Sequence, residues 1–188
     1  MQPFDQLIQR HSTPSRLLAE PGPTPEQLEQ LLTLAMRVPD HGALTPWRIL
    51  AIAGDARLRL GEFVRQRGVE VNPAQSEGAQ TKDRERFTRA PLVLGVIASP
   101  VDRPGVPAIE QILSAGAVCF NLLQGAQALG LGAQWLTGWP CYDPAIASHL
   151  GVREHEHVVG FIHIGTPTQV APERPRPDPA AHFSIWHG

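Results

Sequence analysis

The sequence predicts one domain in which a β-sheet is covered by helices on both faces. Two runs, Trp47–Ala53 and Leu92–Ala98, have the length and composition of strands, and the second is a near-continuous apolar run bounded by prolines, as buried strands are. Segments with helical spacing of apolar residues separate the strands at irregular intervals, and no internal repeat is visible. This pattern is typical of the α+β or the α/β class, and 188 residues suffice for one domain with a sizeable core.

The N-terminal half predicts three helices around the first strand. Pro3–Arg10 places apolar residues three and four positions apart and ends at a basic residue. The second helix is the best marked, because Thr24 suits the N-cap, Pro25 suits the first helical position and Gln27 completes a capping box. After the first strand we expect a polar helix at Asp55–Arg67.

The C-terminal half alternates helices and strands less regularly. Residues 70–91 are highly charged, and we expect a mobile, solvated helix there. The tail, residues 166–188, holds too many prolines for a helix, so it should run extended over the surface or over a partner. The other expected elements are a long uncharged helix at Ala108–Leu129, a short strand opening into a loop at Gly132–Gly138, a helix at Pro144–Leu150 and a strand at His157–Gly165.

Net charge and cysteine content argue against several partners and locations. Sixteen Lys and Arg residues against 18 Asp and Glu residues give a net charge of −2, so no overall field attracts nucleic acid or an anionic membrane. Cys119 and Cys141 have neither metal-binding nor disulfide-rich spacing and are expected to be packing residues. The N-terminus lacks the basic and apolar regions of a signal peptide, so we expect a cytoplasmic protein. Residues 111–142 carry no charge, but polar residues and glycines interrupt them, which favours a buried helix over a membrane span.

None of the usual nucleotide, metal or nucleophile motifs occurs in the sequence. There is no GxGxxG after a strand, no GxxxxGK[ST], no HExxH and no GxSxG. His155 and His157 alternate as metal ligands do, but their charged neighbours favour a solvated turn that enters the last strand. No metal site is therefore predicted.

Two stretches carry polar side chains suited to a ligand, and each has a structural alternative. Arg10, His11 and Ser12 could bind a phosphate through a guanidinium, a hydroxyl and free backbone amides, or the basic residue could cap the helix before it. The loop Arg37–His41 could hold a ligand or form salt bridges of its own. Trp135, which precedes a Leu-Thr-Gly loop, is expected to pack in the core.

Four motifs follow one another along the chain: RHSTPSR, MRVPDHGALTPWRILAI, QALGLGAQWLTG and VVGFIHIGTP. Together they resemble the motifs of the nitroreductase family of FMN-dependent NAD(P)H oxidoreductases, in particular its branch of short single-domain NAD(P)H nitroreductases. The match extends from Leu7 to Pro179. It implies an α+β fold with a mixed central sheet, and an entwined homodimer with two FMN sites that each use both chains. Residues 1–188 would form one FMN-binding domain, with 166–188 as an arm around the partner.

The resemblance also implies roles for individual residues. Arg10, His11 and Ser12 of one subunit would hold the phosphate and ribityl chain of FMN, and Arg37 and His41 of the other subunit would reach the same flavin. The flavin ring edge would be lined by Leu136, Thr137 and Gly138, and NAD(P) would be contacted by Ala126, Gln127, Ala128, Leu129, Gly130 and Leu131.

The implied reaction passes electrons from NADH or NADPH through FMN to a nitroaromatic, a quinone or a similar small acceptor, by a ping-pong mechanism. Because the flavin carries the chemistry, no catalytic side chain is required. Alternatives on the same fold are a flavin reductase, a reductase of another small molecule, and a non-catalytic flavin-binding dimer. Relatives can carry a basic residue where Leu136 stands, so we expect Arg174 or Arg176 to supply the missing positive charge near the flavin or its phosphate.

Overall fold

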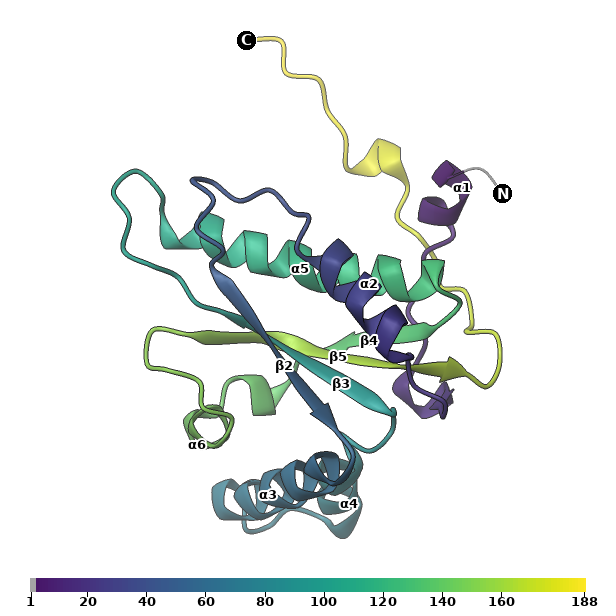
Figure 1. Ribbon diagram of the computed structural model, residues 1–188, viewed down its shortest axis with the longest axis vertical. Helices are drawn as coiled ribbons and strands as arrows, with labels where there is room; N and C mark the ends of the chain where they lie inside the picture. Colours follow the sequence, from purple (N-terminus) through teal and green to yellow (C-terminus); the bar gives the residue numbers. More distant parts are fainter. Residues whose placement is uncertain (1–2) are drawn as a thin grey trace.

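The computed structural model describes residues 3–188 and shows a β-sheet between two layers of helices (Figure 1). The strands β2 and β3 have the bounds that the sequence indicated. The strands are β1 (Leu18–Ala19), β2 (Trp47–Ala53), β3 (Leu92–Ala98), β4 (Gly132–Leu136) and β5 (His157–Pro167). The helices are α1 (Pro3–Ile8), α2 (Pro25–Ala35), α3 (Asp55–Val71), α4 (Glu77–Glu85), α5 (Ala108–Ala128) and α6 (Pro144–His149). Short 3-10 turns lie at Ser15–Leu17, Trp139–Cys141 and Pro179–Ala181.

The sheet is built around β3 and β5. β3 pairs with β2 on one side and with β5 on the other, β4 pairs with β5, and β1 pairs with the last residues of β5. The α+β class is confirmed, but every pairing among the described strands is antiparallel, which differs from the mixed sheet that the resemblance implied. For β2 and β3 the reason lies in their connection. Two helices, α3 and α4, return the chain to the end of the sheet that it left, so the next strand runs the opposite way.

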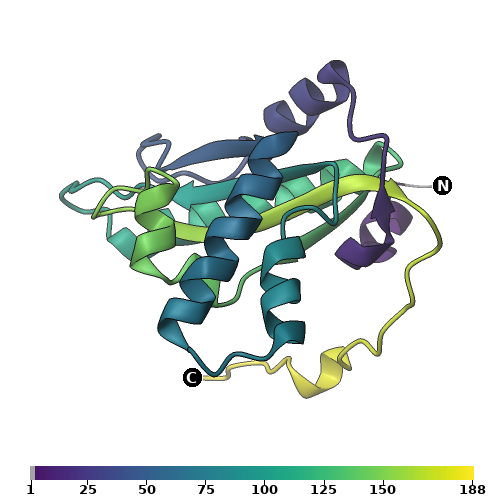
Figure 2. The same ribbon diagram turned by 90° about the horizontal axis from the view of Figure 1, so that it is seen from below.

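Two hydrophobic cores lie on opposite faces of the sheet, so the prediction of helices on both faces is confirmed. One core joins α2 and α5 to the sheet and contains Leu122 and Ile162. The other joins α3 and α6 to the sheet and contains Val64 and Phe161. The neighbouring β5 residues Phe161 and Ile162 belong to different cores because successive side chains of a strand point to opposite faces. Figure 2 shows α3, α4 and α6 lying across one face of the sheet.

The second helix begins as the sequence predicts. The Thr24 hydroxyl accepts a hydrogen bond from Gln27 N at 3.2 Å, and the Gln27 side chain accepts one from Thr24 N at 2.9 Å. This reciprocal capping box satisfies two backbone donors at the start of α2. Pro25 occupies the first turn, where its missing N–H has no consequence.

The charged segment before β3 forms a packed helix, which corrects the expectation of a mobile, solvated one. Position 61 of α3 accommodates only a glycine, because the carbonyl oxygen of Arg84 lies where a Cβ atom would stand. Asp83 of α4 is 3% exposed, and Phe87, which follows the helix, is fully buried. Composition alone does not reveal this contact, because one glycine on α3 and one buried acid on α4 create it. α3 also continues to Val71, beyond its predicted end.

The remaining expectations concern the tail, the cysteines and the uncharged helix. The tail leaves β5 at Pro167, so residues 166 and 167 belong to the strand, and the residues after them run extended except for the last 3-10 turn (Figure 1). Cys119 and Cys141 are buried, and burial raises the pKa of their thiols to about 12 and about 11, so both are packing residues, as predicted. No helix in residues 3–188 combines the length and the apolar character that a membrane span requires.

Candidate functional site

The loop that follows β4 forms the centre of the candidate site. Leu136 is half-buried at the end of the strand, whereas Thr137 and Gly138 are exposed. Gly138 has a φ of 114°, which residues with a side chain rarely adopt. A glycine is therefore needed to turn the chain into the 3-10 turn that starts at Trp139. The loop presents exposed backbone next to the sheet.

A basic pocket lies beside this loop. Arg86 reaches the loop most closely, since its Nη1 atom lies 3.7 Å from the position of a Cβ atom on Gly138. No carboxylate is among the described residues that line the cavity, so it suits an anion or a ligand with acceptor atoms at its edge. Three of its cations come from the charged stretch of residues 82–89 and the fourth, Arg16, from a distant segment, so the sequence does not show that they share a pocket. The pocket, of about 280 Å³, is lined mainly by Arg16, Lys82, Arg86, Arg89, Gln134 and Leu136.

Polar atoms near the basic pocket have no partner among the described residues. The Nε atom of Arg86 is buried without a hydrogen bond. His163 is fully buried and lies opposite Gln134 in the β4–β5 ladder, so both side chains are on the same sheet face, and neither ring nitrogen of His163 has a partner. Burial, and then the charges of Arg86 and Arg89, lowers the pKa of His163 to about 4, so the imidazole is neutral at pH 7. Buried polar atoms without partners are rare, and these fit a site that holds a polar ligand.

The segment of residues 10–12 runs beside the start of β4. His11 N donates to Gln127 Oε1 at 3.1 Å, near the end of α5. Thr13 N donates to Ala133 O at 2.9 Å. These bonds bring the first predicted group of FMN residues to the edge of the sheet that carries the basic pocket.

Arg10 is gathered with two arginines of the C-terminal tail, whereas Ser12 is exposed. Arg176 Nη2 donates to Arg10 O at 3.1 Å. Partial burial, and then the positive charges of Arg176 and Arg174, lowers the pKa of Arg10. Glu173 pairs with Arg176 at 2.7 Å, and the positive charge that remains on the cluster suits a phosphate. The positive charge near Leu136 comes from the basic pocket, whereas Arg174 and Arg176 lie near Arg10.

The loop between α2 and β2 is held by its own polar groups. Asp40 accepts hydrogen bonds from Leu44 N at 3.1 Å and from Thr45 N at 2.8 Å. His41 Nδ1 lies 2.7 Å from Glu110 Oε2, in the first turn of α5. In the single chain, this loop is therefore held by its own ion pair and hydrogen bonds, which is the structural alternative to a ligand-binding loop. Thr45 has a φ of 50°, an uncommon conformation for a β-branched residue that is often found near functional sites.

One chain does not bring His41 and His11, from the two predicted groups of FMN residues, together. His41 is bound at Glu110, near the start of α5, and His11 is bound at Gln127, near its end. A helix rises about 1.5 Å per residue, so these positions are about 25 Å apart. Arg37 is bound between these two positions, because its carbonyl accepts from the α5 residue Asn121 at 3.0 Å, about 9 Å along the helix from Gln127 and about 16 Å from Glu110.

The predicted NAD(P) segment, residues 126–131, forms the end of α5. Leu131 N donates to Ala126 O at 2.8 Å and Gly130 N donates to Gln127 O at 3.0 Å, which is the Schellman pattern of helix ends. Gly130 has a φ of 74°, the left-handed conformation that this pattern requires. The glycine thus has a structural role, and contact with NAD(P) stays a prediction.

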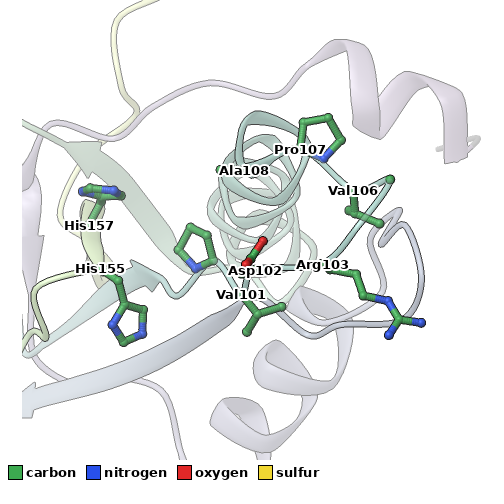
Figure 3. A pocket seen from close by; sticks show the side chains of 10 residues that line it. Val101, Asp102, Arg103, Val106, Pro107, Ala108, His155 and His157 are labelled. Atoms are coloured by element: carbon green, nitrogen blue, oxygen red, sulfur yellow. The ribbon is translucent and has the colours of Figure 1, made fainter.

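A separate cavity of about 580 Å³ lies between the β3–α5 loop and the start of β5 (Figure 3). His155 and His157 line it from β5 and the turn before it, and both are exposed, which agrees with the predicted solvated turn. It shares no lining residue with the basic pocket. Among residues 3–188, no group of three or more His, Cys, Asp or Glu side chains is arranged to hold a metal ion.

Comparisons with known proteins agree with this fold and its motifs. Over 167 residues the chain is 36% identical to "Putative NAD(P)H nitroreductase YdjA" of Escherichia coli strain K12, and the match covers 89% of each chain. The structure of a nitroreductase-like family protein from Bacillus cereus superposes with a TM-score of 0.82 at 23% identity, covering 100% of this chain and 97% of that one. A nitroreductase with bound FMN from Bacteroides fragilis gives a TM-score of 0.73 at 18% identity over 100% of both chains. Residues 7–166 match the model of the nitroreductase family, and the chain therefore belongs to that family.

Proposed function

We propose that this protein is an FMN-dependent oxidoreductase that passes electrons from NADH or NADPH to nitroaromatic, quinone or similar small acceptors. The observation that carries the proposal is the basic pocket beside the Leu136–Gly138 loop, with unpaired polar atoms next to it. Family membership and a relative named as an NAD(P)H nitroreductase support it. The FMN-bound structure from Bacteroides fragilis has the same fold.

The residues present fit FMN in two regions. The ring edge would lie at Thr137 and Gly138, and the phosphate would lie near Arg10, where Arg174 and Arg176 add positive charge. When bound, FMN supplies the hydride chemistry, so the chain needs no acid, base or nucleophile of its own. The cations of the basic pocket would stabilise the negative charge that a flavin gains with electrons.

We propose that electron donor and electron acceptor occupy one position in turn, in a ping-pong mechanism. Thr137 and Gly138 are exposed, so a ligand reaches this loop directly from solvent. Residues 126–131 would contact the nicotinamide nucleotide from the end of α5. Parallel lines in double-reciprocal plots at several acceptor concentrations would support this order, and intersecting lines would contradict it.

An exposed apolar surface supports a homodimer. Exposed apolar side chains lie on α1, on α5 and on the tail, where Phe183 and Trp186 are exposed aromatic residues. Large exposed apolar surfaces of this kind mark interfaces. Because His41 and His11 are bound to α5 at positions about 25 Å apart, we propose that each FMN site uses both chains and that the tail wraps the partner. The exposed apolar residues on α1 and α5 are Phe4, Leu7, Ile8, Ile109, Leu113 and Phe120.

The first test is a visible absorption spectrum of the purified protein, with mass spectrometry of any cofactor that heating releases. We expect about one FMN per subunit, bleaching of the flavin by NADH or NADPH, and recovery of its absorbance when a quinone or nitroaromatic is added. A colourless protein that also fails to take up added FMN would overturn the proposal. A flavin that NADH and NADPH both leave oxidised would favour the non-catalytic alternative.

A further inference from the structure

Asp83 is a buried carboxylate with three hydrogen-bonding partners from different parts of the chain. It lies in α4 and is 3% exposed. Its Oδ1 atom accepts from Arg86 Nη2 at 3.0 Å and from Trp139 Nε1 at 3.2 Å. Its Oδ2 atom accepts from Gln75 Nε2 at 2.7 Å. A buried acid with three donors has a defined orientation.

Two of the three bonds reach the candidate site. Arg86 lines the basic pocket and approaches Gly138, and Trp139 follows Gly138 directly in the chain. A single oxygen of Asp83 therefore binds both a cation of the basic pocket and Trp139, the residue that follows the Leu136–Gly138 loop. The third bond, to Gln75, joins α4 to the turn after α3 and reaches no residue that lines the pocket.

Electrostatics explains why the pocket needs such an anchor. Arg86 shares the cavity with Arg16, Lys82 and Arg89. Like charges in one cavity repel one another, and an arginine side chain has many rotamers through which it can move toward water. The bond to Asp83, with both side chains largely buried, holds the guanidinium in place.

We propose that Asp83 is a positioning residue of the flavin site, which holds Arg86 in the basic pocket and fixes the Thr137–Gly138 loop through Trp139. This inference rests on the proposed function, because it assumes that FMN binds at that loop. It adds a residue that contacts no ligand itself and that acts through two neighbours.

The test uses Asp83→Asn, which keeps the shape of the side chain and removes its charge. We expect the dissociation constant for FMN to rise about tenfold. We also expect the midpoint potential of bound FMN to fall, because Arg86 no longer stays near the flavin. If Asp83 acted only through the electric field of its own charge, the substitution would raise the midpoint potential, since the loss of a negative charge makes the flavin easier to reduce. A raised potential or an unchanged affinity would overturn the proposal.

Further variants separate positioning from loss of stability. In an Arg86→Gln background, Asp83→Asn should change FMN affinity much less than it does alone, as a double-mutant cycle requires for residues that act together. Trp139→Phe removes one bond to Asp83 and should weaken FMN binding about threefold. Gln75→Ala is the matched control, because it removes the third bond. It should lower Tm and leave FMN affinity unchanged.

The outcomes also separate this inference from the proposed function. If the wild-type protein does not bind FMN, both fall. If the wild-type protein binds FMN but Asp83→Asn leaves FMN affinity unchanged, both alone and in the Arg86→Gln background, only the role of Asp83 is wrong. Equal loss of affinity in Asp83→Asn and Gln75→Ala would show that Asp83 acts through the stability of α4.

Discussion

Single residues place positive charge in two regions of the candidate site, and the two regions differ in how visible they are in the sequence. Arg10, Arg174 and Arg176 lie in motifs or in a proline-rich tail, where they could be singled out. The cations of the basic pocket could not, because three of them lie among acidic residues in the stretch of residues 82–89 and the fourth, Arg16, comes from a distant segment. The turn at Ser15–Leu17 carries Arg16 to the pocket, because Ser15 N donates to the side chain of Gln134 in β4 at 2.6 Å.

The tail arginines give the prediction that belongs to this scale. Replacing Arg174 and Arg176 together with alanine should weaken FMN binding about tenfold, because two cations near Arg10 would be lost. Fluorescence titration of the apoprotein with FMN measures this. Arg59→Ala, on the exposed side of α3, is the control for loss of a surface arginine. Unchanged FMN affinity in the double variant would refute the role of the tail.

At the scale of elements, an ion pair joins β2 to the turn before β5. Arg48 Nε and Nη2 donate to the two carboxylate oxygens of Glu156 at 3.0 and 2.8 Å, and the Glu156 side chain is fully buried. The hydrogen bond with Arg48, above all, lowers the pKa of Glu156 from 4.5 to about 2. Because the folded pKa lies below the unfolded one, the stabilisation is complete above pH 4.5 and is lost as the pH falls toward 2.

The pH dependence of stability tests this pair. At pH 7, Glu156→Gln should lower the free energy of unfolding by about 2 kcal/mol relative to wild type. That difference should shrink steadily below pH 4.5. Urea unfolding at several pH values measures it, with Glu29→Gln on the exposed side of α2 as the control for loss of one acid. A difference that stays constant down to pH 3 would contradict the assignment.

The elements also show where sequence patterns suffice. The bounds of β2 and β3 and the capping box of α2 follow from local composition, because apolar runs and cap residues act within a few positions. The two-residue strand β1 has no such signal, since it exists only where Leu18 meets Pro167 of β5. The packed face of α4 depends in the same way on a distant residue, Gly61.

For the whole molecule, the apolar face of α5 predicts a dimer that charge would break. Leu113 and Phe120 lie seven positions apart on one side of the helix and are 66% and 46% exposed. Replacing both with glutamate should convert the dimer into a monomer, which light scattering after size exclusion measures. FMN binding should be abolished at the same time. Leu58→Glu, equally exposed on α3, should leave the dimer intact. A monomeric wild-type protein would refute the dimer directly.

The last prediction concerns the way in which two chains build one site. If Arg10 and Ser12 of one chain meet Arg37 and His41 of the other, then a chain altered in one pair can complement a chain altered in the other pair. One variant carries alanine at the first pair and a second variant carries alanine at the second pair. Each homodimer then has two damaged sites. A heterodimer has one site with both lesions and one intact site, because a two-fold axis relates the sites.

Heterodimers purified through two different affinity tags should therefore bind about half as much FMN as the wild-type dimer, while each variant homodimer binds little. If all four residues served a site within one chain, both sites of the heterodimer would stay damaged and FMN binding would not recover. The spacing of about 25 Å between the α5 positions that bind His41 and His11 makes the first result the expected one.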